Sequence, residues 1–167
     1  MHTLQHLLVH EVQDLYSAEK QLIEALPKMA EKASHPQLKA AFQNHLAETE
    51  QHARRLEQIA QMLDVDADEV TCKAMKGLIK EGEEVMSESD DPAVTDAGLI
   101  GAAQKVEHYE MAGYGTARAH AQNLGLTEIA RLLQQTLDEE SAANEKLTGL
   151  AEGPAAINKF ARSAAGG

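Results

Sequence analysis

Apolar residues recur at alternating steps of three and four positions along four long stretches of this chain. The first stretch ends at about Ala33, and its apolar positions are Leu4, Leu8, Leu15, Leu22, Leu26 and Met29. In an α-helix this spacing gathers the side chains on one face, which is then buried against other helices. Only 3% of the residues are aromatic and Trp is absent, so residue types that favour strands are scarce. The sequence therefore predicts an all-α protein.

The breaks between these stretches indicate how the helices are connected. Proline or polar residues interrupt the apolar pattern near Pro36, at Asp64–Asp68, at Ser87–Pro92 and at Asn123–Gly125. Long helices joined by short turns pack as antiparallel neighbours, which predicts helical hairpins at about residues 3–63 and 93–151. A shorter amphipathic segment lies in the long connection between the hairpins. We therefore expect a ferritin-like four-helix bundle whose crossover contains a short fifth helix.

The chain length of 167 residues suits a single folded domain. We expect that domain to cover residues 1–151, because the apolar pattern of the last long helix stops before Gly153 and Pro154. The segment that follows is rich in Ala, Ser and Gly and has few apolar residues to bury. We therefore expect residues 152–167 to form a flexible tail with at most a turn.

Charge and cysteine content restrict the partners and the compartment. The formal net charge of −12 argues against nucleic acid and against an anionic membrane, because both attract cationic surfaces. No stretch approaches the roughly 20 apolar residues of a membrane span, and the first residues do not resemble a signal peptide. Cys72 is the single cysteine, which suits a reducing compartment. We expect a cytoplasmic protein.

Acidic residues interrupt the apolar face of every long helix. Glu19, for example, lies between Leu15 and Leu22 and should point inward. A buried carboxylate must be neutralised by a proton, a cationic side chain or a metal ion. A pair of divalent ions held between four helices needs a carboxylate from each helix and nitrogen ligands about one turn away. The candidate ligands of such a dinuclear site are Glu19, Glu48, His52, Glu107, Glu110, Glu139 and Glu140.

One assignment within this set and the role of a neighbouring histidine stay open. On the fourth long helix the apolar face selects Glu140, whereas an alignment of the two hairpins at an offset of 91 residues selects Glu139 and pairs it with Glu48. The same offset pairs Glu19 with Glu110. His45 lies three residues before Glu48 and is either a further ligand or a histidine that forms a hydrogen bond in the core.

Several segments occur in the order and at the separations of a known family. They are Asp14–Leu22, His45–Thr49, Cys72–Leu78, Ala102–Glu110 with Tyr114-Gly115, and Glu139-Glu140 followed by Glu145–Leu147. Across about residues 3–150 the chain resembles the YciF/YciE family of bacterial stress-response proteins, a ferritin-like family of previously unknown function. The resemblance implies a helical bundle, a homodimer and a role in stress response, with iron or a similar metal in the core.

The wider ferritin and rubrerythrin class has a related pattern, and a pair of glutamates three residues apart in that class matches Glu107 and Glu110. The chain departs from that class at its histidines. A Glu-x-x-His motif would place histidine at position 51, where the chain has Gln51, and the fourth helix has Ala142 and Ala143 where a second histidine would fall. The site is thus rich in oxygen ligands, which favours hard ions such as manganese as well as iron.

The function predicted from these observations is a dinuclear iron or manganese protein that handles oxygen or peroxide under stress. The sequence leaves open whether the site turns over a substrate, and it does not identify a redox partner. The alternative is a non-catalytic structural or interaction module whose core glutamates bind no metal. Iron storage or DNA protection in a protein shell is a third reading, although the acidic charge disfavours the DNA version.

Overall fold

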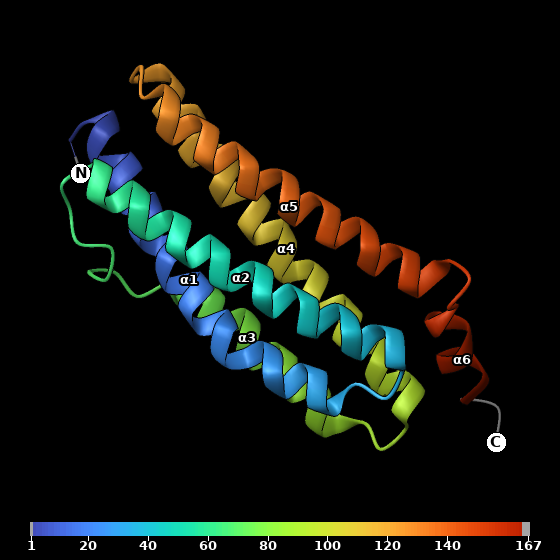
Figure 1. Ribbon diagram of the computed structural model, residues 1–167. Coiled ribbons are helices and arrows are strands. Elements are labelled where there is room, and N and C mark those ends of the chain that lie inside the picture. Colours follow the sequence, from blue (N-terminus) through green and yellow to red (C-terminus); the bar gives the residue numbers. More distant parts are fainter. Residues whose placement is uncertain (1, 165–167) are drawn as a thin grey trace.

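The structure is a computed structural model that describes residues 2–164, and its helices form an elongated bundle (Figure 1). The helices are, in chain order, α1 (Leu4–Lys32), α2 (Pro36–Met62), α3 (Lys73–Glu88), α4 (Pro92–Asn123), α5 (Thr127–Glu152) and α6 (Ile157–Ala164). The predicted all-α class is confirmed.

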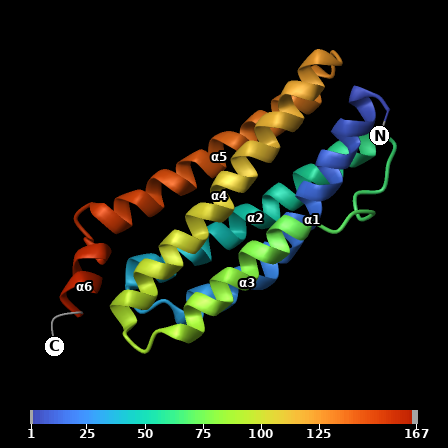
Figure 2. The same ribbon diagram turned by 180° about the vertical axis from the view of Figure 1, so that it is seen from behind.

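The four long helices form two antiparallel hairpins. α1 packs against α2, α4 packs against α5, and further contacts join α1 to α4 and α2 to α5. The connection between the hairpins contains α3, which lies against α1 and α4 on the face seen in Figure 2. This arrangement confirms the predicted ferritin-like bundle with a short helix in its crossover.

Two aspartates, Asp91 and the buried Asp96, form hydrogen bonds with the backbone at the turns between helices. Asp91 accepts hydrogen bonds from the backbone nitrogens of Ala93 at 2.8 Å and Val94 at 3.0 Å, which caps the start of α4. One turn later, the carboxylate of Asp96 accepts bonds from the backbone nitrogens of Ser34 and His35, both at 2.8 Å. Asp96 therefore fastens the α1–α2 turn to the first turns of α4.

Two apolar clusters fill the bundle, one toward each end. One contains Leu22, Leu26 and Phe42 together with residues of α4 and α5. The other contains Leu8, Leu15, Leu56, Tyr114 and Leu133. Buried acidic residues and histidines lie between these clusters on all four long helices. The polar centre of the bundle is therefore enclosed by apolar packing at both ends.

The structure differs from the sequence prediction in the C-terminal segment. Residues 157–164 form α6, which packs against α4 and α5, rather than a chain with at most one turn. The side chain that anchors this helix is Ile157, which is 2% exposed and belongs to the first apolar cluster. The last part of the predicted tail, residues 165–167, lies outside the described residues.

Within the described residues, none of the helices combines the length and the apolar character needed to cross a bilayer.

Gly113 lies where α4 packs closely against Leu15 of α1, which supports a prediction on stability. A Cβ atom at Gly113 would lie 2.8 Å from Cδ2 of the buried Leu15, whereas a Cβ atom at the exposed Gly101 of the same helix would meet nothing within 4 Å. Gly113→Ala should therefore lower the free energy of unfolding, because an overpacking cost of about 1–3 kcal/mol exceeds the gain in helix propensity. Gly101→Ala should raise it by about 0.5–1 kcal/mol. Urea unfolding of both variants checks the opposite signs, and equal effects would contradict the close packing.

Candidate metal centre

Six buried acidic and histidine side chains converge at the middle of the bundle. They come from all four long helices: Glu19 of α1, His45 and His52 of α2, Glu107 and Glu110 of α4, and Glu140 of α5. Each is at most 8% exposed. The helical period of 3.6 residues explains why both histidines point inward, since seven residues are close to two full turns.

These side chains form two groups of potential ligands that share one residue. His45, Glu107, Glu110 and Glu140 offer ligand atoms that all lie within 4.8 Å of one another, and the same holds for Glu19, His52 and Glu140. In the first group, Nε2 of His45 lies 3.2 Å from Oε1 of Glu107 and 3.9 Å from Oε2 of Glu140. In the second, Nδ1 of His52 lies 2.8 Å from Oε1 of Glu140 and 3.6 Å from Oε1 of Glu19. Two adjacent ion positions bridged by Glu140 fit this arrangement.

Many polar atoms of the cluster are buried without a hydrogen-bond partner among the described residues. They are Oε2 of Glu19, Nε2 of His45, Nδ1 of His52, Oε2 of Glu107, and both carboxylate oxygens of Glu110 and Glu140. The close contact between His52 and Glu140 lacks the alignment of a hydrogen bond, so the two groups converge without satisfying each other. Orphaned buried polar atoms are costly, and native proteins rarely keep them without a ligand, water or ion.

Burial and mutual repulsion disfavour the charged carboxylates in the absence of a cation. Burial raises the pKa of Glu110 well above its usual range, and the charges of Glu140 and Glu19 raise it further. The pKa of Glu140 is also raised by burial, against the opposing effect of His52. Burial lowers the pKa of His52, but the nearby carboxylates of Glu140 and Glu19 outweigh it and raise that pKa to about 10. The centre is therefore short of positive charge.

Neighbouring side chains orient two members of the cluster. The Tyr114 hydroxyl, fully buried, donates a hydrogen bond to Oε1 of Glu19. On the other side, Nε2 of His52 lies 2.9 Å from Oε2 of Glu139, whose carboxylate also accepts bonds from the Arg55 guanidinium at 2.9 and 3.3 Å. A carboxylate that holds one nitrogen of a histidine directs its other nitrogen, here Nδ1, into the cluster.

Not all of the seven predicted ligands belong to the two groups. Five lie inside the two groups: Glu19, His52, Glu107, Glu110 and Glu140. Glu139 stands at the edge with its side chain 36% exposed and is held by Arg55. Glu48 belongs to neither group. Its side chain is 52% exposed and lies against the outer nitrogen of His45, with Nδ1 of His45 3.4 Å from Oε2 of Glu48.

The structure also adds residues that the sequence left open or missed. His45 enters the first group, and its seven-residue spacing from His52 is the signal that places both on one helix face. The sequence favoured neither Tyr109 nor Tyr114 as the residue that orients a carboxylate, and the structure pairs Tyr114 with Glu19 of α1. Arg55 of α2 bonds Glu139 because α5 packs beside α2, and the sequence of α2 alone does not show this contact.

The donor set fits a pair of divalent metal ions. Four carboxylates carry four negative charges, which two divalent ions balance, and the two imidazoles supply a nitrogen to each group. Six donors of this kind, mostly oxygen, suit iron or manganese better than soft ions that prefer thiolates. The orphaned oxygens of Glu110 and Glu140 are the atoms that such ions would satisfy.

The bundle and its centre define the class of the protein: a ferritin-like helical bundle with a carboxylate and histidine cluster in its core. Within this class, the chain belongs to the family described as "Domain of unknown function (DUF892)", whose model matches residues 3–162. That range includes most of α6.

Two relatives resemble the chain over nearly its whole length. Protein YciF of Escherichia coli (strain K12) is 45% identical over 152 residues, which is 90% of this chain and 92% of that protein. The crystal structure of the E. coli stress protein YciF matches with a TM-score of 0.87, covering 90% of this chain and 96% of that one. A Rhodopseudomonas palustris protein described as YcfI, a putative structural protein, is 44% identical with a TM-score of 0.86, covering 89% and 94%. The resemblance seen in the sequence is thereby confirmed.

A more distant structure supports the fold alone. A ferritin-like, diiron-carboxylate protein from Bacillus anthracis matches with a TM-score of 0.70 at 18% identity, covering 90% of this chain and 99% of that one.

Proposed function

We propose that the protein holds two divalent metal ions, iron or manganese, between its four long helices and uses them to handle oxygen or peroxide under stress. One ion would be held by His45, Glu107 and Glu110, the other by Glu19 and His52, with Glu140 shared between them. A bound pair of such ions supplies the electrons for reducing oxygen or peroxide. The description of the E. coli relative as a stress protein supports the physiological part of this proposal.

The observation that carries the proposal is the position of Glu140. It is fully buried, lies in both ligand groups, and has two carboxylate oxygens with no hydrogen-bond partner among the described residues. A bridging carboxylate needs one free oxygen for each ion, so this geometry matches a dinuclear site. His52 approaches one of these oxygens at 2.8 Å without an aligned hydrogen bond. A solvated or hydrogen-bonded glutamate would have no reason to keep both oxygens without a hydrogen bond.

Metal analysis after anaerobic loading tests the proposal. Protein stripped with chelator, incubated with ferrous or manganous ion and desalted should retain about two ions per chain, as dinuclear bundle sites do. The bound ions should also raise the melting temperature, because they stabilise only the folded state. Protein that retains no metal after loading, with an unchanged melting temperature, would sink the proposal.

A structural or interaction module is the second candidate, favoured by the description of the R. palustris relative as a putative structural protein. In such a module the buried glutamates would be protonated. Incubation with manganous ion would then change neither the melting temperature nor the metal content. The loading experiment therefore separates the two functions.

The cytoplasmic location and the homodimer belong to the same proposal. Sizing chromatography with light scattering checks the dimer, and a particle the size of a ferritin shell would contradict it.

A further inference from the structure

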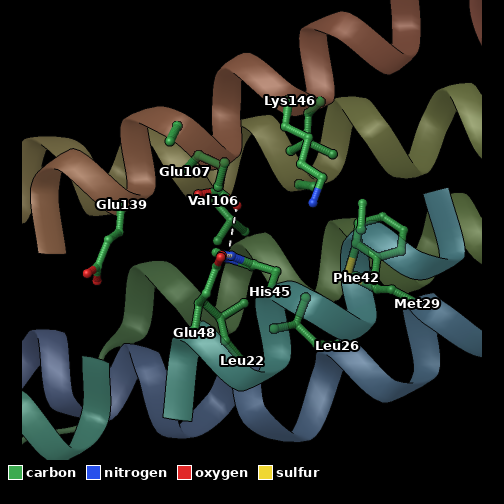
Figure 3. Close-up of a pocket in the computed structure, with 15 residues that line it drawn as sticks. Leu22, Leu26, Met29, Phe42, His45, Glu48, Val106, Glu107, Glu139 and Lys146 are labelled. Atoms are coloured by element: carbon green, nitrogen blue, oxygen red, sulfur yellow. Dashed lines mark hydrogen bonds and ion pairs between the residues drawn. The ribbon is translucent and has the colours of Figure 1, made fainter. Parts of the chain in front are cut away.

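A cavity of about 190 Å³ opens beside one end of the metal centre. It is lined by residues of α1, α2, α4 and α5, and the paired side chains of His45 and Glu107 form part of its wall (Figure 3). These are two members of the first ligand group. Anything that occupies the cavity therefore stands next to one of the two proposed ion positions.

The size and lining of the cavity exceed what dioxygen or hydrogen peroxide requires. A water molecule takes about 30 Å³ of liquid, and a dry cavity of about 150 Å³ lined by leucine and phenylalanine holds benzene. Apolar side chains make up most of the wall, among them Leu22, Leu26 and Phe42. The space thus suits a small organic group, whereas hydrogen peroxide would gain nothing from the apolar wall.

The cavity exists because of small residues on α5. Ala143 lies three residues after Glu140, at the position where the Glu-x-x-His motif of the wider class has histidine, and it lines the cavity together with Ala142. Glu140 keeps its place in the centre, whereas the side chain that would fill the space ends at Cβ. The cavity therefore lies beside the first ligand group, where the wider class has a histidine side chain.

The charges around the cavity select a neutral occupant. Its wall contains the carboxylates of Glu48, Glu107 and Glu139 and the single ammonium group of Lys146. Figure 3 shows Lys146 extending from α5 over the space, with Phe42 and Leu26 on the other side. Glu139 is already paired with Arg55, and the proposed ion would balance Glu107. Glu48 and Lys146 then remain as one negative and one positive group, so no net positive charge favours an organic anion such as a fatty acid.

We propose that this cavity binds the organic part of an alkyl or aryl hydroperoxide, with its peroxide end toward His45 and Glu107. The inference rests on the proposed function, of which it names the substrate class. In the reaction, two ferrous ions would each give one electron to the hydroperoxide. Its O–O bond breaks, the two oxygen atoms take up two protons, and the alcohol and water leave.

Binding to the metal-free protein gives the first test. The probe is 2-phenyl-2-propanol, the unreactive alcohol that corresponds to cumene hydroperoxide, titrated into chelator-treated protein and followed by calorimetry. The unsubstituted protein should bind it and should not bind the anion phenylacetate. Ala143→Leu, which fills the cavity, should weaken binding by about tenfold or more, the scale of a steric block in an apolar pocket.

The matched control is Ala47→Leu, the same change on the exposed face of α2 outside the cavity wall. It should leave binding of the alcohol unchanged. Equal losses in both variants, no binding at all, or equal binding of phenylacetate would each overturn the inference.

Oxidation of the ferrous-loaded protein gives the second test. Ala143→Leu should slow oxidation by cumene hydroperoxide about tenfold and oxidation by hydrogen peroxide less than about twofold, because only the larger oxidant needs the cavity. Intact iron loading with both oxidants affected alike would overturn the hydroperoxide inference and leave the proposed function standing. Failure of the unsubstituted protein to load iron would overturn the proposed function itself, and the inference with it.

Discussion

Glu140→Gln is expected to abolish binding of both metal ions, the largest single effect that the centre offers. Glu140 is the residue common to the two ligand groups. Glutamine keeps its size but removes the negative charge and one of the two oxygen ligands. Changes to residues that only orient metal ligands already cost 10–100-fold in affinity, so the loss of a shared ligand should cost more than about 100-fold. The stabilisation by metal, about 4 kcal/mol at a thousandfold excess over the dissociation constant, should disappear.

Glu139→Gln is the matched control. The two glutamates are adjacent on α5, but Glu139 is partly exposed and is held by Arg55. This variant should still retain about two ions per chain, with a reduced affinity for the ion beside His52, since its role is to orient that ring. Metal content and melting temperature, measured on both variants with and without manganous ion, check the difference. Equal metal loss in the two variants would contradict the assignment of Glu140 as the bridge.

The fold follows from the sequence because its determinants are local and repeated. Each long helix has an apolar face that continues for several turns, and the breaks between helices contain proline or polar residues. Helix α6 was missed because eight residues contain too few turns to show a period, and its order depends on Ile157 entering a cluster formed by other helices.

The rotation of each helix about its axis explains which ligands could be predicted. His45 and His52 are seven residues apart and point the same way, whereas Glu48 lies three residues from His45, about 60° off that direction on an ideal helix. That angle is enough to turn Glu48 toward solvent. Likewise, Glu139 and Glu140 differ by about 100° on the helix. Glu140 is the buried one, as the apolar face of this helix indicated, whereas the 91-residue offset had selected Glu139.

Helix α4 shows the opposite case. Glu107 and Glu110 are as far apart in angle as His45 and Glu48, yet both are buried. The reason is that α1, α3, α5 and α6 all pack against α4, so the buried part of its surface is wider than one face. The number of neighbours of a helix is a property of the assembled bundle and cannot be read from that helix alone.

The stability of the metal-free protein is expected to fall as the pH rises from 6 to 8. The pKa of Glu140 is about 8 in the folded chain, because of burial and the nearby acidic residues, against about 4.3 in an unfolded chain. A raised carboxyl pKa contributes stability below the unfolded value and loses it as the pH rises through the folded value. Burial raises the pKa of Glu110 in the same direction.

His52 adds to this trend. Its pKa of about 10 means that the stability from its protonated form is complete below about pH 6.5 and is lost between pH 6.5 and 10. All three groups thus act in one direction between pH 6 and 8. The free energy of unfolding should therefore decrease over that range.

Metal loading should reverse the sign of this pH dependence. Carboxylates and imidazoles must lose their protons to bind an ion, so affinity and the resulting stabilisation increase as the pH rises. Urea unfolding at pH 6, 7 and 8, with chelator or with excess manganous ion at constant ionic strength, measures both slopes. The double variant Glu110→Gln, Glu140→Gln should flatten the metal-free slope and lose the response to manganese. Parallel slopes with and without manganese would mean that the buried carboxylates do not exchange protons for metal, and the metal centre would then have to be abandoned.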